Sequence, residues 1–453
     1  MTVKPWLRLL GASACLVSTA LFTSCGGGGG NDSGFFPIGT VTTPSTPAPA
    51  TGVKIVVTGP NAVSTWNEIA IDTINVAPAT SGTAAEQRPI DSVDLATVHL
   101  AIYDALVAIT GGYQPWAVVP NTALTGETSQ PAAVAAAAYG VLKRLYPNRS
   151  AQYQAAYDSY VAGIASGAAK VAGLQLGAEV ADGILALRGS STGDDGRSVA
   201  LSPYVPGTAP GQFRGVNPIN RFYPAVKPFG VTSTAQFRVP PPPSLDSELY
   251  AANLIETREF GGAVTTQRTD AQLEIARFHT EPPPRFWPRN LRRLAMTDRP
   301  LTEQARLLAM LFTVQADATT TCFESKYFYE FWRPQSAIPL ADTDGNPATT
   351  ADTGWTPVVP TPNHPEYPAA HACNAAAIAE AMKAFFGTDR IEFYFDSTVT
   401  GTTHNFTTLP GFVDEIRGAR IYGGMHFRNS LVQGEALGSN VAKHILDRHF
   451  KAR

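Results

Sequence analysis

The 453-residue sequence contains few charged residues, few cysteines and, after its first 25 residues, no long apolar run. Charged residues make up 16% of the chain and the formal net charge is −3, so no whole-protein field favours nucleic acid or an acidic membrane surface. No later segment has the roughly 18 continuous apolar residues of a membrane-spanning helix, which predicts a soluble body. We therefore expect no nucleic-acid partner, and any anion site must come from a local cluster of Lys and Arg.

Residues 1–25 have the features of an export signal. Lys4 and Arg8 precede a short apolar stretch, 9–22, and the segment ends in Thr-Ser-Cys25 before a run of glycines. Small residues before a Cys, followed by a flexible tract, resemble the bacterial lipoprotein processing site, where the Cys becomes the lipid-bearing first residue. We therefore predict lipidation of Cys25 and a place in the bacterial cell envelope, periplasmic or at the surface, with the lipid as the only membrane contact. An ordinary secretory signal that ends near a Cys is the alternative.

The rest of the sequence predicts a tether followed by a mostly helical fold. Residues 26–57 are rich in Gly, Thr, Pro and Ser, which is typical of a flexible linker. Helical spacing of apolar residues then runs through an N-terminal region, 58–300, and a C-terminal region, 301–453, with strand-like alternation scarce outside 391–408. The irregular stretch 189–243 either wraps the surface or serves function. Helices are expected from residue 66 and over 95–106, 131–145, 151–188, 245–259, 268–279, 301–331, 369–386 and 430–449.

Two cysteines, Cys322 and Cys373, lie in the C-terminal region near the basic and imidazole groups described below. In an oxidising periplasm they could form a disulfide. Two separately buried thiols are equally compatible with the sequence, because connectivity cannot be read from it.

The first of three chemically suggestive segments runs from Lys326 to Pro334. Seven residues of an α-helix turn through about 700°, so the spacing predicts that Lys326 and Arg333 project from one helix face, with Pro334 ending the helix. Two cations beside aromatic side chains would be costly without an anion between them. The alternative is a solvated face with a coincidental spacing.

The second segment spans residues 362–374 and contains two histidines. Pro368 suits the first turn of a helix, which would leave the following amides free to point at an anion. His371 would then lie in that first turn, placed for proton transfer. We expect His364, in the proline-rich loop, to be structural.

The third segment places Arg420 six residues before His426, with Gly423 and Gly424 between them. This spacing is not one face of a straight helix, so a long Arg side chain or a break at the glycines must bring the two groups together. The glycine pair would allow backbone and ligand to approach closely. A glycine-rich turn before a surface helix is the alternative.

In this order, the patterns Lys-x6-Arg-Pro, Pro-x-x-His and Arg-x5-His resemble the superfamily that unites vanadium-dependent haloperoxidases with type 2 phosphatidic acid phosphatases. The segments 98–105, 204–211 and 344–350 also resemble soluble bacterial haloperoxidase-like members, so the likeness covers most of the chain after residue 60. The resemblance implies a mostly α fold, a helical bundle of the vanadium haloperoxidase and acid phosphatase type. It also implies vanadate as the cofactor.

The resemblance assigns roles to individual residues. His426 would ligate vanadium in a haloperoxidase, or attack phosphorus in a phosphatase. His371 would act as the acid–base partner, and the backbone amide of Ala370 would bind the oxyanion. Three basic side chains would neutralise the oxyanion's oxygens: Lys326, Arg333 and Arg420.

Two departures from the family pattern bear on function. The family's Pro-Ser-Gly-His reads Pro-Ala369-Ala370-His371, which removes a hydroxyl donor and places a non-glycine residue where a left-handed backbone would be strained. The phosphatase pattern also has an Asp where Ser430 stands, so another acceptor must orient His426.

Three functions are therefore compatible with the sequence. The first is a vanadate-dependent peroxidase that oxidises a halide with hydrogen peroxide, the second a periplasmic acid phosphatase that cleaves a phosphate ester through a phosphohistidine. The third is an oxyanion-binding lipoprotein without turnover. The expected partners are thus small molecules, with a possible homodimer.

Overall fold

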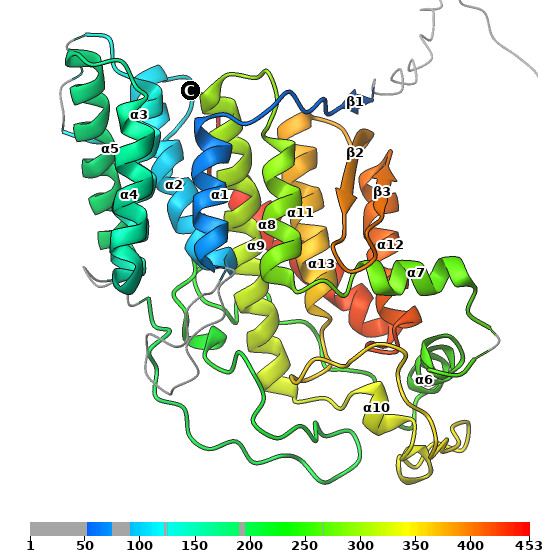
Figure 1. The fold of residues 1–453 in the computed structure, drawn as a ribbon. Coiled ribbons are helices and arrows are strands. Elements are labelled where there is room, and N and C mark those ends of the chain that lie inside the picture. Colours follow the sequence, from blue (N-terminus) through cyan, green and yellow to red (C-terminus); the bar gives the residue numbers. More distant parts are fainter. Residues whose placement is uncertain (1–51, 75–90, 122–123, 125, 190–194, 266) are drawn as a thin grey trace, which may run out of the picture. The chain divides into compact units, whose positions relative to one another are not determined.

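A computed structural model describes residues 52–74, 91–121, 124, 126–189, 195–265 and 267–453. The predicted signal segment, Cys25 and most of the predicted tether lie outside these residues. All the described residues fall in one compact unit, Pro49–Arg453, which contains both predicted helical regions. The unit is mostly helical, as the sequence predicted (Figure 1).

The α-helices of the described residues are α1 Ala62–Ile74, α2 Asp91–Thr110, α3 Gln130–Leu145, α4 Ser150–Ala162, α5 Ala168–Leu187, α6 Glu248–Gly261, α7 Asp270–Phe278, α8 Pro283–Leu294, α9 Leu301–Tyr329, α10 Pro334–Ala337, α11 Ala370–Phe386, α12 Leu409–Tyr422 and α13 Arg428–Leu446. Short 3-10 turns lie at Pro147–Arg149, Tyr223–Ala225 and Ala341–Thr343. The strands are β1 Val53–Lys54, β2 Ile391–Asp396 and β3 Thr403–Phe406.

Helix α9 is the centre of the core. It is buried almost continuously from Thr302 to Lys326 and packs against α2, α11 and α13 (Figure 1). Among the described helices, α2 alone is long and apolar enough to cross a membrane, and 83% of the relevant window is buried inside the protein. The C-terminal half of α9 lies against the N-terminal part of α11, since Thr319 Oγ1 donates to Asn374 Oδ1 at 2.8 Å.

Helices α8 and α12 were missed by the sequence analysis because prolines and glycines interrupt their patterns. Helix α8 begins at Pro283 and contains Pro288, while α12 contains Gly411 and Gly418. Proline costs little in the first turn of a helix, where its missing N–H would have no partner. A cap also supports α12, since the Gly411 amide donates to Thr408 Oγ1 at 3.1 Å.

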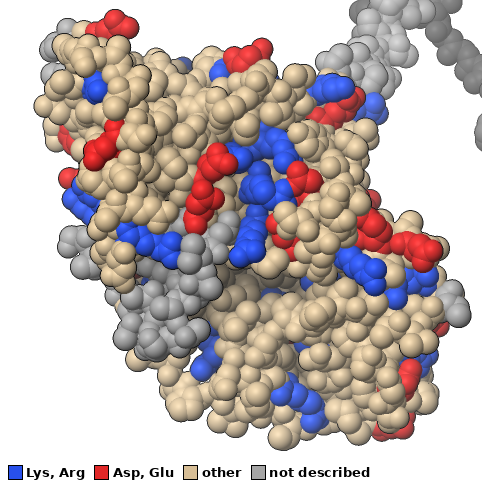
Figure 2. All heavy atoms as spheres, viewed as in Figure 1, with Lys and Arg blue, Asp and Glu red and all other residues tan. Residues whose placement is uncertain are grey.

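The outward face of α8 is basic and shows as a blue column in Figure 2. Most of its arginines have carboxylate partners: for example, Arg293 pairs with Asp396 at 2.5 Å and Arg292 with Glu68 at 2.6 Å. These are partly exposed ion pairs of modest energy. We interpret this column as a solvated face, not an anion site.

A small sheet contacts α8 through β2, where the Asp396 amide donates to Asn290 Oδ1 at 3.0 Å. Strand β1 pairs in parallel with β2 and β2 pairs antiparallel with β3, so Val53 lies opposite Ile391 and Phe393 opposite Phe406. The sequence analysis placed residues up to 57 in the tether. The fold begins earlier, because β1 is paired with the sheet.

The long irregular stretch before α6 is held by buried carboxylates, not by helices. The Asp317 carboxylate of α9 accepts hydrogen bonds from the amides of Phe229, Gly230 and Val231 at 2.7–3.0 Å. Nearby, charged side chains from α2, from the C-cap of α5 and from this stretch form a buried ion-pair system, which we call the paired network: Asp94, Arg188, Asp195 and Arg197.

Candidate oxyanion site

Lys326 and Arg333 lie on different elements, which corrects the predicted single helix. Helix α9 ends at Tyr329, and Glu330 closes it in a left-handed conformation with φ 46°, its backbone N–H donating a hydrogen bond to the Lys326 carbonyl. Arg333 is the N-cap of α10, and Pro334 begins that helix instead of ending the previous one. The two cations still share one interior region, because Lys326 lies in the last turn of α9.

Both side chains are fully buried and bind backbone carbonyls. Lys326 Nζ donates to Pro365 O at 3.0 Å and to Glu366 O at 2.9 Å. Arg333 Nε donates to His364 O at 2.9 Å, and its Nη1 donates to Met425 O at 2.9 Å. These bonds fix both cations against the loop before α11 and the turn before α13.

A break at the glycines brings Arg420 and His426 into the same interior region. Helix α12 ends at Tyr422, and Gly424 has φ +72°. A Cβ on Gly424 would lie 2.4 Å from the Gly261 carbonyl oxygen, so only glycine fits. Arg420, in the last turn of α12, and His426, just after the break, are both buried. We call Lys326, Arg333 and Arg420 the cation cluster.

Glu366 is the acceptor that orients the His426 ring. His426 Nδ1 lies 2.9 Å from Glu366 Oε1, which also accepts the Phe427 amide at 3.0 Å. Arg333 Nη1 lies 3.0 Å from the other nitrogen, His426 Nε2. Because Arg333 can only donate, Nε2 carries the lone pair and Nδ1 the proton. Ser430 instead lies 3.4 Å from the Glu366 carbonyl oxygen and does not contact this ring.

The sequence analysis missed Glu366 and set His364 aside as structural. Glu366 is fully buried, which is rare for a carboxylate. The one signal in the sequence was its position in an apolar Pro-Glu-Tyr-Pro stretch between the two histidines. His364 is also buried, and Arg333 Nη2 lies 3.0 Å from its Nδ1. It therefore packs directly against the cation cluster.

The N-terminus of α11 supplies backbone donors and one imidazole. The helix begins at Ala370 with Ala369 as N-cap. Pro368 therefore lies just outside the helix, and the prediction that it occupies the first turn is wrong. The first intrahelical bond joins the Cys373 amide to Ala369 O, which leaves the amides of Ala370, His371 and Ala372 without an intrahelical partner. Ala370 has an ordinary helical backbone, so replacing glycine causes no strain there.

The His371 side chain lies in the first turn of α11, as predicted, and is half-buried. It interacts electrostatically with Arg420, Lys326 and Arg333, and burial followed by these cations holds its pKa well below the ordinary value. A bound anion would cancel the cations' effect and favour the protonated ring. The group is thus placed to take or give a proton beside the cation cluster.

Burial also shifts the pKa values of the cations themselves. It lowers the pKa of Lys326 to about 8 and that of Arg333 to about 10, and burial with repulsion from Arg333 lowers the pKa of Arg420 to about 9. Burial raises the pKa of Glu366 to about 7, against the attraction of Arg333 and Lys326. No carboxylate of the described residues lies within ion-pair distance of the cation cluster. Three cations near one carboxylate leave at least two positive charges uncompensated.

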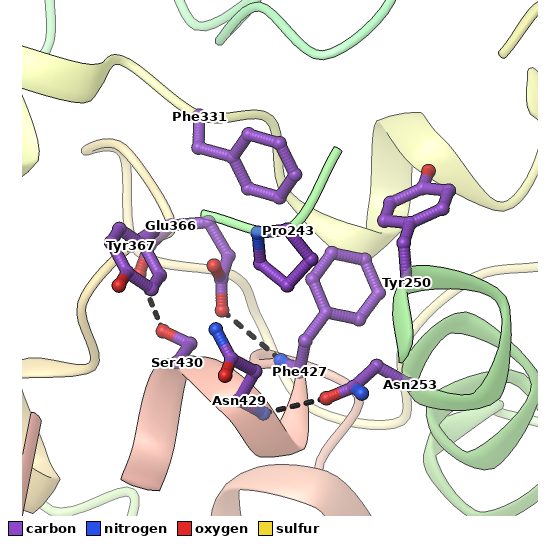
Figure 3. Close-up of a pocket in the computed structure, with 9 residues that line it drawn as sticks. All are labelled: Pro243, Tyr250, Asn253, Phe331, Glu366, Tyr367, Phe427, Asn429 and Ser430. Atoms are coloured by element: carbon purple, nitrogen blue, oxygen red, sulfur yellow. Dashed lines mark hydrogen bonds between the residues drawn. The ribbon is translucent and has the colours of Figure 1, made fainter. Parts of the chain in front are cut away.

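Glu366 also forms part of the wall of an aromatic cavity (Figure 3). Its Oε2 is buried and has no hydrogen-bond partner among the described residues. The cavity lies on the side of Glu366 formed by α6 and α13, and its other lining residues are Pro243, Tyr250, Asn253, Phe331, Tyr367, Phe427, Asn429 and Ser430. The low polarity of these walls explains why the carboxyl holds its proton to a higher pH.

Cys322 and Cys373 are free, buried thiols that lie against each other between α9 and α11. Cys322 Sγ also lies 3.7 Å from Pro368 O. The disulfide that the sequence left open is therefore not formed, although the two side chains are neighbours.

The arrangement fits a small tetrahedral oxyanion. It combines buried cations, free helix amides and a lone-pair nitrogen at His426, and the Nε of Arg420 is buried without a partner among the described residues. Arg420 otherwise donates to the His279 carbonyl at 3.0 Å. Guanidinium groups and helix N-termini are the donors that phosphate-like anions prefer.

Comparisons with known proteins agree with this arrangement. Residues 306–452 match a family model described as the VCPO second helical-bundle domain. No curated protein sequence matches the chain. Among solved structures, a bacterial vanadium-dependent iodoperoxidase is similar, with 20% identity, a TM-score of 0.66, and coverage of 88% of this chain and 99% of the other.

Two forms of a bacterial vanadium-dependent chloroperoxidase are also similar, each with 14% identity. The match to the holo form has a TM-score of 0.62 and covers 86% of this chain and 98% of the chloroperoxidase chain. The match to the apo form has a TM-score of 0.60 and covers 82% of this chain and 95% of the chloroperoxidase chain. These likenesses establish the fold, and the domain match covers all of the cation cluster and both candidate histidines. The chain therefore has the fold of the vanadium haloperoxidases, and its residues 306–452 match the second helical-bundle domain of that family.

Proposed function

We propose that this protein is a vanadate-dependent peroxidase that oxidises a halide with hydrogen peroxide. The observation that carries the proposal is the charge imbalance around His426: three buried cations, free helix amides and one carboxylate. An anion with one or two negative charges would neutralise the excess. The similar structures, which are named as a vanadium-dependent iodoperoxidase and chloroperoxidase, support vanadate as that anion.

The chain's own groups divide the work. Lys326, Arg333 and Arg420 would hold the oxygens of vanadate, and the Ala370 amide would add a backbone donor. His426 Nε2 would be the protein's ligand, because Glu366 keeps the proton on Nδ1. Vanadate, when bound, supplies a Lewis-acid centre that polarises hydrogen peroxide.

His371 would handle the proton that the reaction needs. Oxidation of a halide ion by hydrogen peroxide takes up one proton and gives hypohalous acid and water. The His371 imidazole is half-buried, lies near the three cations and makes no side-chain hydrogen bond within the described part of the chain. It would therefore be able to exchange a proton with solvent and with a substrate in the site.

Acid phosphatase activity is the second candidate, and the His426 tautomer favours it equally. A lone pair on Nε2, supported by a carboxylate on Nδ1, is also what a nucleophilic histidine requires. Phosphate and vanadate have the same shape, so one set of donors serves both. Because Ala369 lacks the hydroxyl donor, the binding of either anion would be weaker by roughly 1.5–3 kcal/mol.

The deciding experiment assays the purified full chain with and without added vanadate. We expect peroxide-dependent oxidation of iodide or bromide only with vanadate, and its loss in His426→Ala but not in His444→Ala, a matched change on α13. Cleavage of a phosphate ester with trapping of labelled phosphate on His426, and no halide oxidation, would support the phosphatase instead. Tight vanadate binding with neither activity would support an oxyanion-binding protein without turnover.

We further propose that Cys25 carries a lipid that anchors the protein in the bacterial cell envelope. Support comes from the sequence alone, because the segment lies outside the described residues. Labelling of cells with a fatty acid should mark the wild type and not Cys25→Ala. A soluble, unlabelled wild-type protein would reject the anchor without affecting the peroxidase proposal.

A further inference from the structure

A second cluster of ligating groups lies near Arg420, which donates to the backbone carbonyl of one of its members, His279. His279 follows α7, His404 lies on β3 and Glu415 lies on α12, three elements that Figure 1 draws next to one another. Glu415 Oε1 is 2.9 Å from His279 Nε2 and 2.8 Å from His404 Nδ1. One nitrogen or oxygen from each residue falls within 4.8 Å of the others.

Glu274 orients this cluster from outside. Its Oε2 lies 2.8 Å from His404 Nε2, the nitrogen that faces away from Glu415. A carboxylate on the far nitrogen of a histidine is the usual support for a metal-binding imidazole, because it holds the proton there and frees the other lone pair. With the proton on Nε2, the lone pair of His404 Nδ1 points at Glu415 Oε1, and a cation between them removes the repulsion.

The charge and the packing also suit a divalent cation. Two neutral imidazoles with the carboxylates of Glu274 and Glu415 carry two negative charges, which one divalent ion would balance. The Phe278 ring stacks on His404 with centroids 3.7 Å apart, which restrains the imidazole. The side chains of His279, His404 and Glu415 are 1%, 13% and 19% exposed, so the cluster opens to solvent on one side.

We propose that His279 Nε2, His404 Nδ1 and Glu415 Oε1 bind a divalent transition-metal ion, with zinc the best match. Two histidines and one carboxylate form a three-ligand set that leaves a fourth tetrahedral position for water. The site is distinct from the oxyanion site, because no hydrogen bond or ion pair within the described residues joins its side chains to Lys326, Arg333 or His426. It adjoins that site through Arg420, which donates to the His279 carbonyl at 3.0 Å.

The competing interpretation is an ion pair in which a protonated His404 bridges Glu274 and Glu415. The two differ in stoichiometric metal binding, which is measurable without vanadate or peroxide. The full chain is stripped with a chelator and titrated with zinc chloride by calorimetry, and separately with cobalt(II), whose visible absorption reports tetrahedral coordination. We expect one tight equivalent of zinc, a tetrahedral cobalt spectrum and a higher unfolding temperature with zinc.

Variants separate this site from the other histidines. His404→Ala and Glu415→Gln should lose the tight equivalent and the cobalt spectrum, while Glu274→Gln should weaken zinc by about 10–100-fold. His371→Ala, His426→Ala and the surface change His444→Ala should keep both signals. Circular dichroism checks that each variant is folded. A wild type that binds no zinc, or that binds it unchanged in folded Glu415→Gln, would overturn the site and leave the ion pair.

Discussion

The paired network and the cation cluster both bury arginines in the interior, but they differ in charge balance. Arg197 lies 2.8 Å from Asp94 and 2.7 Å from Asp195, and Arg188 lies 3.1 Å from Asp195. Burial acts to lower the pKa of Arg197, yet the two aspartates overcome it and raise the pKa. In the cation cluster, burial prevails and the pKa of Arg420 falls to about 9. The charges of the paired network balance one another, whereas the cation cluster retains an excess of positive charge.

We expect the largest effect from a substitution that breaks the paired network. Arg197→Met leaves the carboxylates of Asp94 and Asp195 buried without their main partner, so we expect a loss of about 3–5 kcal/mol in the free energy of unfolding. Affinity for inorganic phosphate should not change in the folded fraction. Urea unfolding and calorimetry measure the two quantities. A loss below about 1 kcal/mol would mean that the network is not what balances these charges.

The second prediction concerns the cation cluster, where we expect a large loss of anion affinity and only a small loss of stability. Arg420→Met removes a cation that has no carboxylate partner, so stability should fall by less than about 2 kcal/mol while phosphate binds roughly tenfold to hundredfold more weakly. Arg417→Met is the matched control on the same helix, since Arg417 pairs with Asp414 and Glu435 instead. Equal phosphate affinity in the wild type and in Arg420→Met would remove Arg420 from the site.

The sequence could predict the local features of the fold and the site, but not those that depend on contacts between distant residues. Helical periodicity and ordered motifs predicted the mostly α fold and the basic residues, because both are local patterns. The capping of α9 by Glu330, which separates Lys326 from Arg333, depends on the tertiary contacts of the following loop. The carboxylate on His426 was missed for the same reason: Glu366 is 60 residues away and meets the ring only after folding.

A third change tests that carboxylate. Glu366→Gln keeps the shape but removes the charge that supports the proton on His426 Nδ1, so we expect vanadate affinity or vanadate-dependent activity to fall by about 10–100-fold. Glu324→Gln is the control, because Glu324 lies on α9 and pairs with Arg238 away from His426. Vanadium-51 resonance spectra and activity assays measure the effect. Full activity in Glu366→Gln would assign the orientation of the ring to Arg333 alone.

The smallest effect concerns pH, and its sign follows from Lys326. Burial lowers the pKa of Lys326 to about 8 in the free protein, and a bound anion raises it by favouring the ammonium. Below pH 8 the Lys326 proton is already present, so Lys326 itself adds no pH dependence to phosphate affinity there. Between about pH 8 and 9, binding must take up a proton, and affinity should fall by up to about tenfold per unit.

The stability of the unliganded protein should rise with pH, whereas its phosphate affinity falls. The unfolded chain binds the Lys326 proton more tightly than the folded chain, so unfolding takes up a proton between the pKa of about 8 and the ordinary value of 10.5. Raising the pH through this window therefore stabilises the fold at the same time as it weakens the anion. Lys326→Met should remove both slopes, whereas changing a residue of the paired network should remove neither. If phosphate affinity in Lys326→Met kept the wild-type decline above pH 8, the excess charge that distinguishes the two regions would have to reside on Arg333 and Arg420 alone.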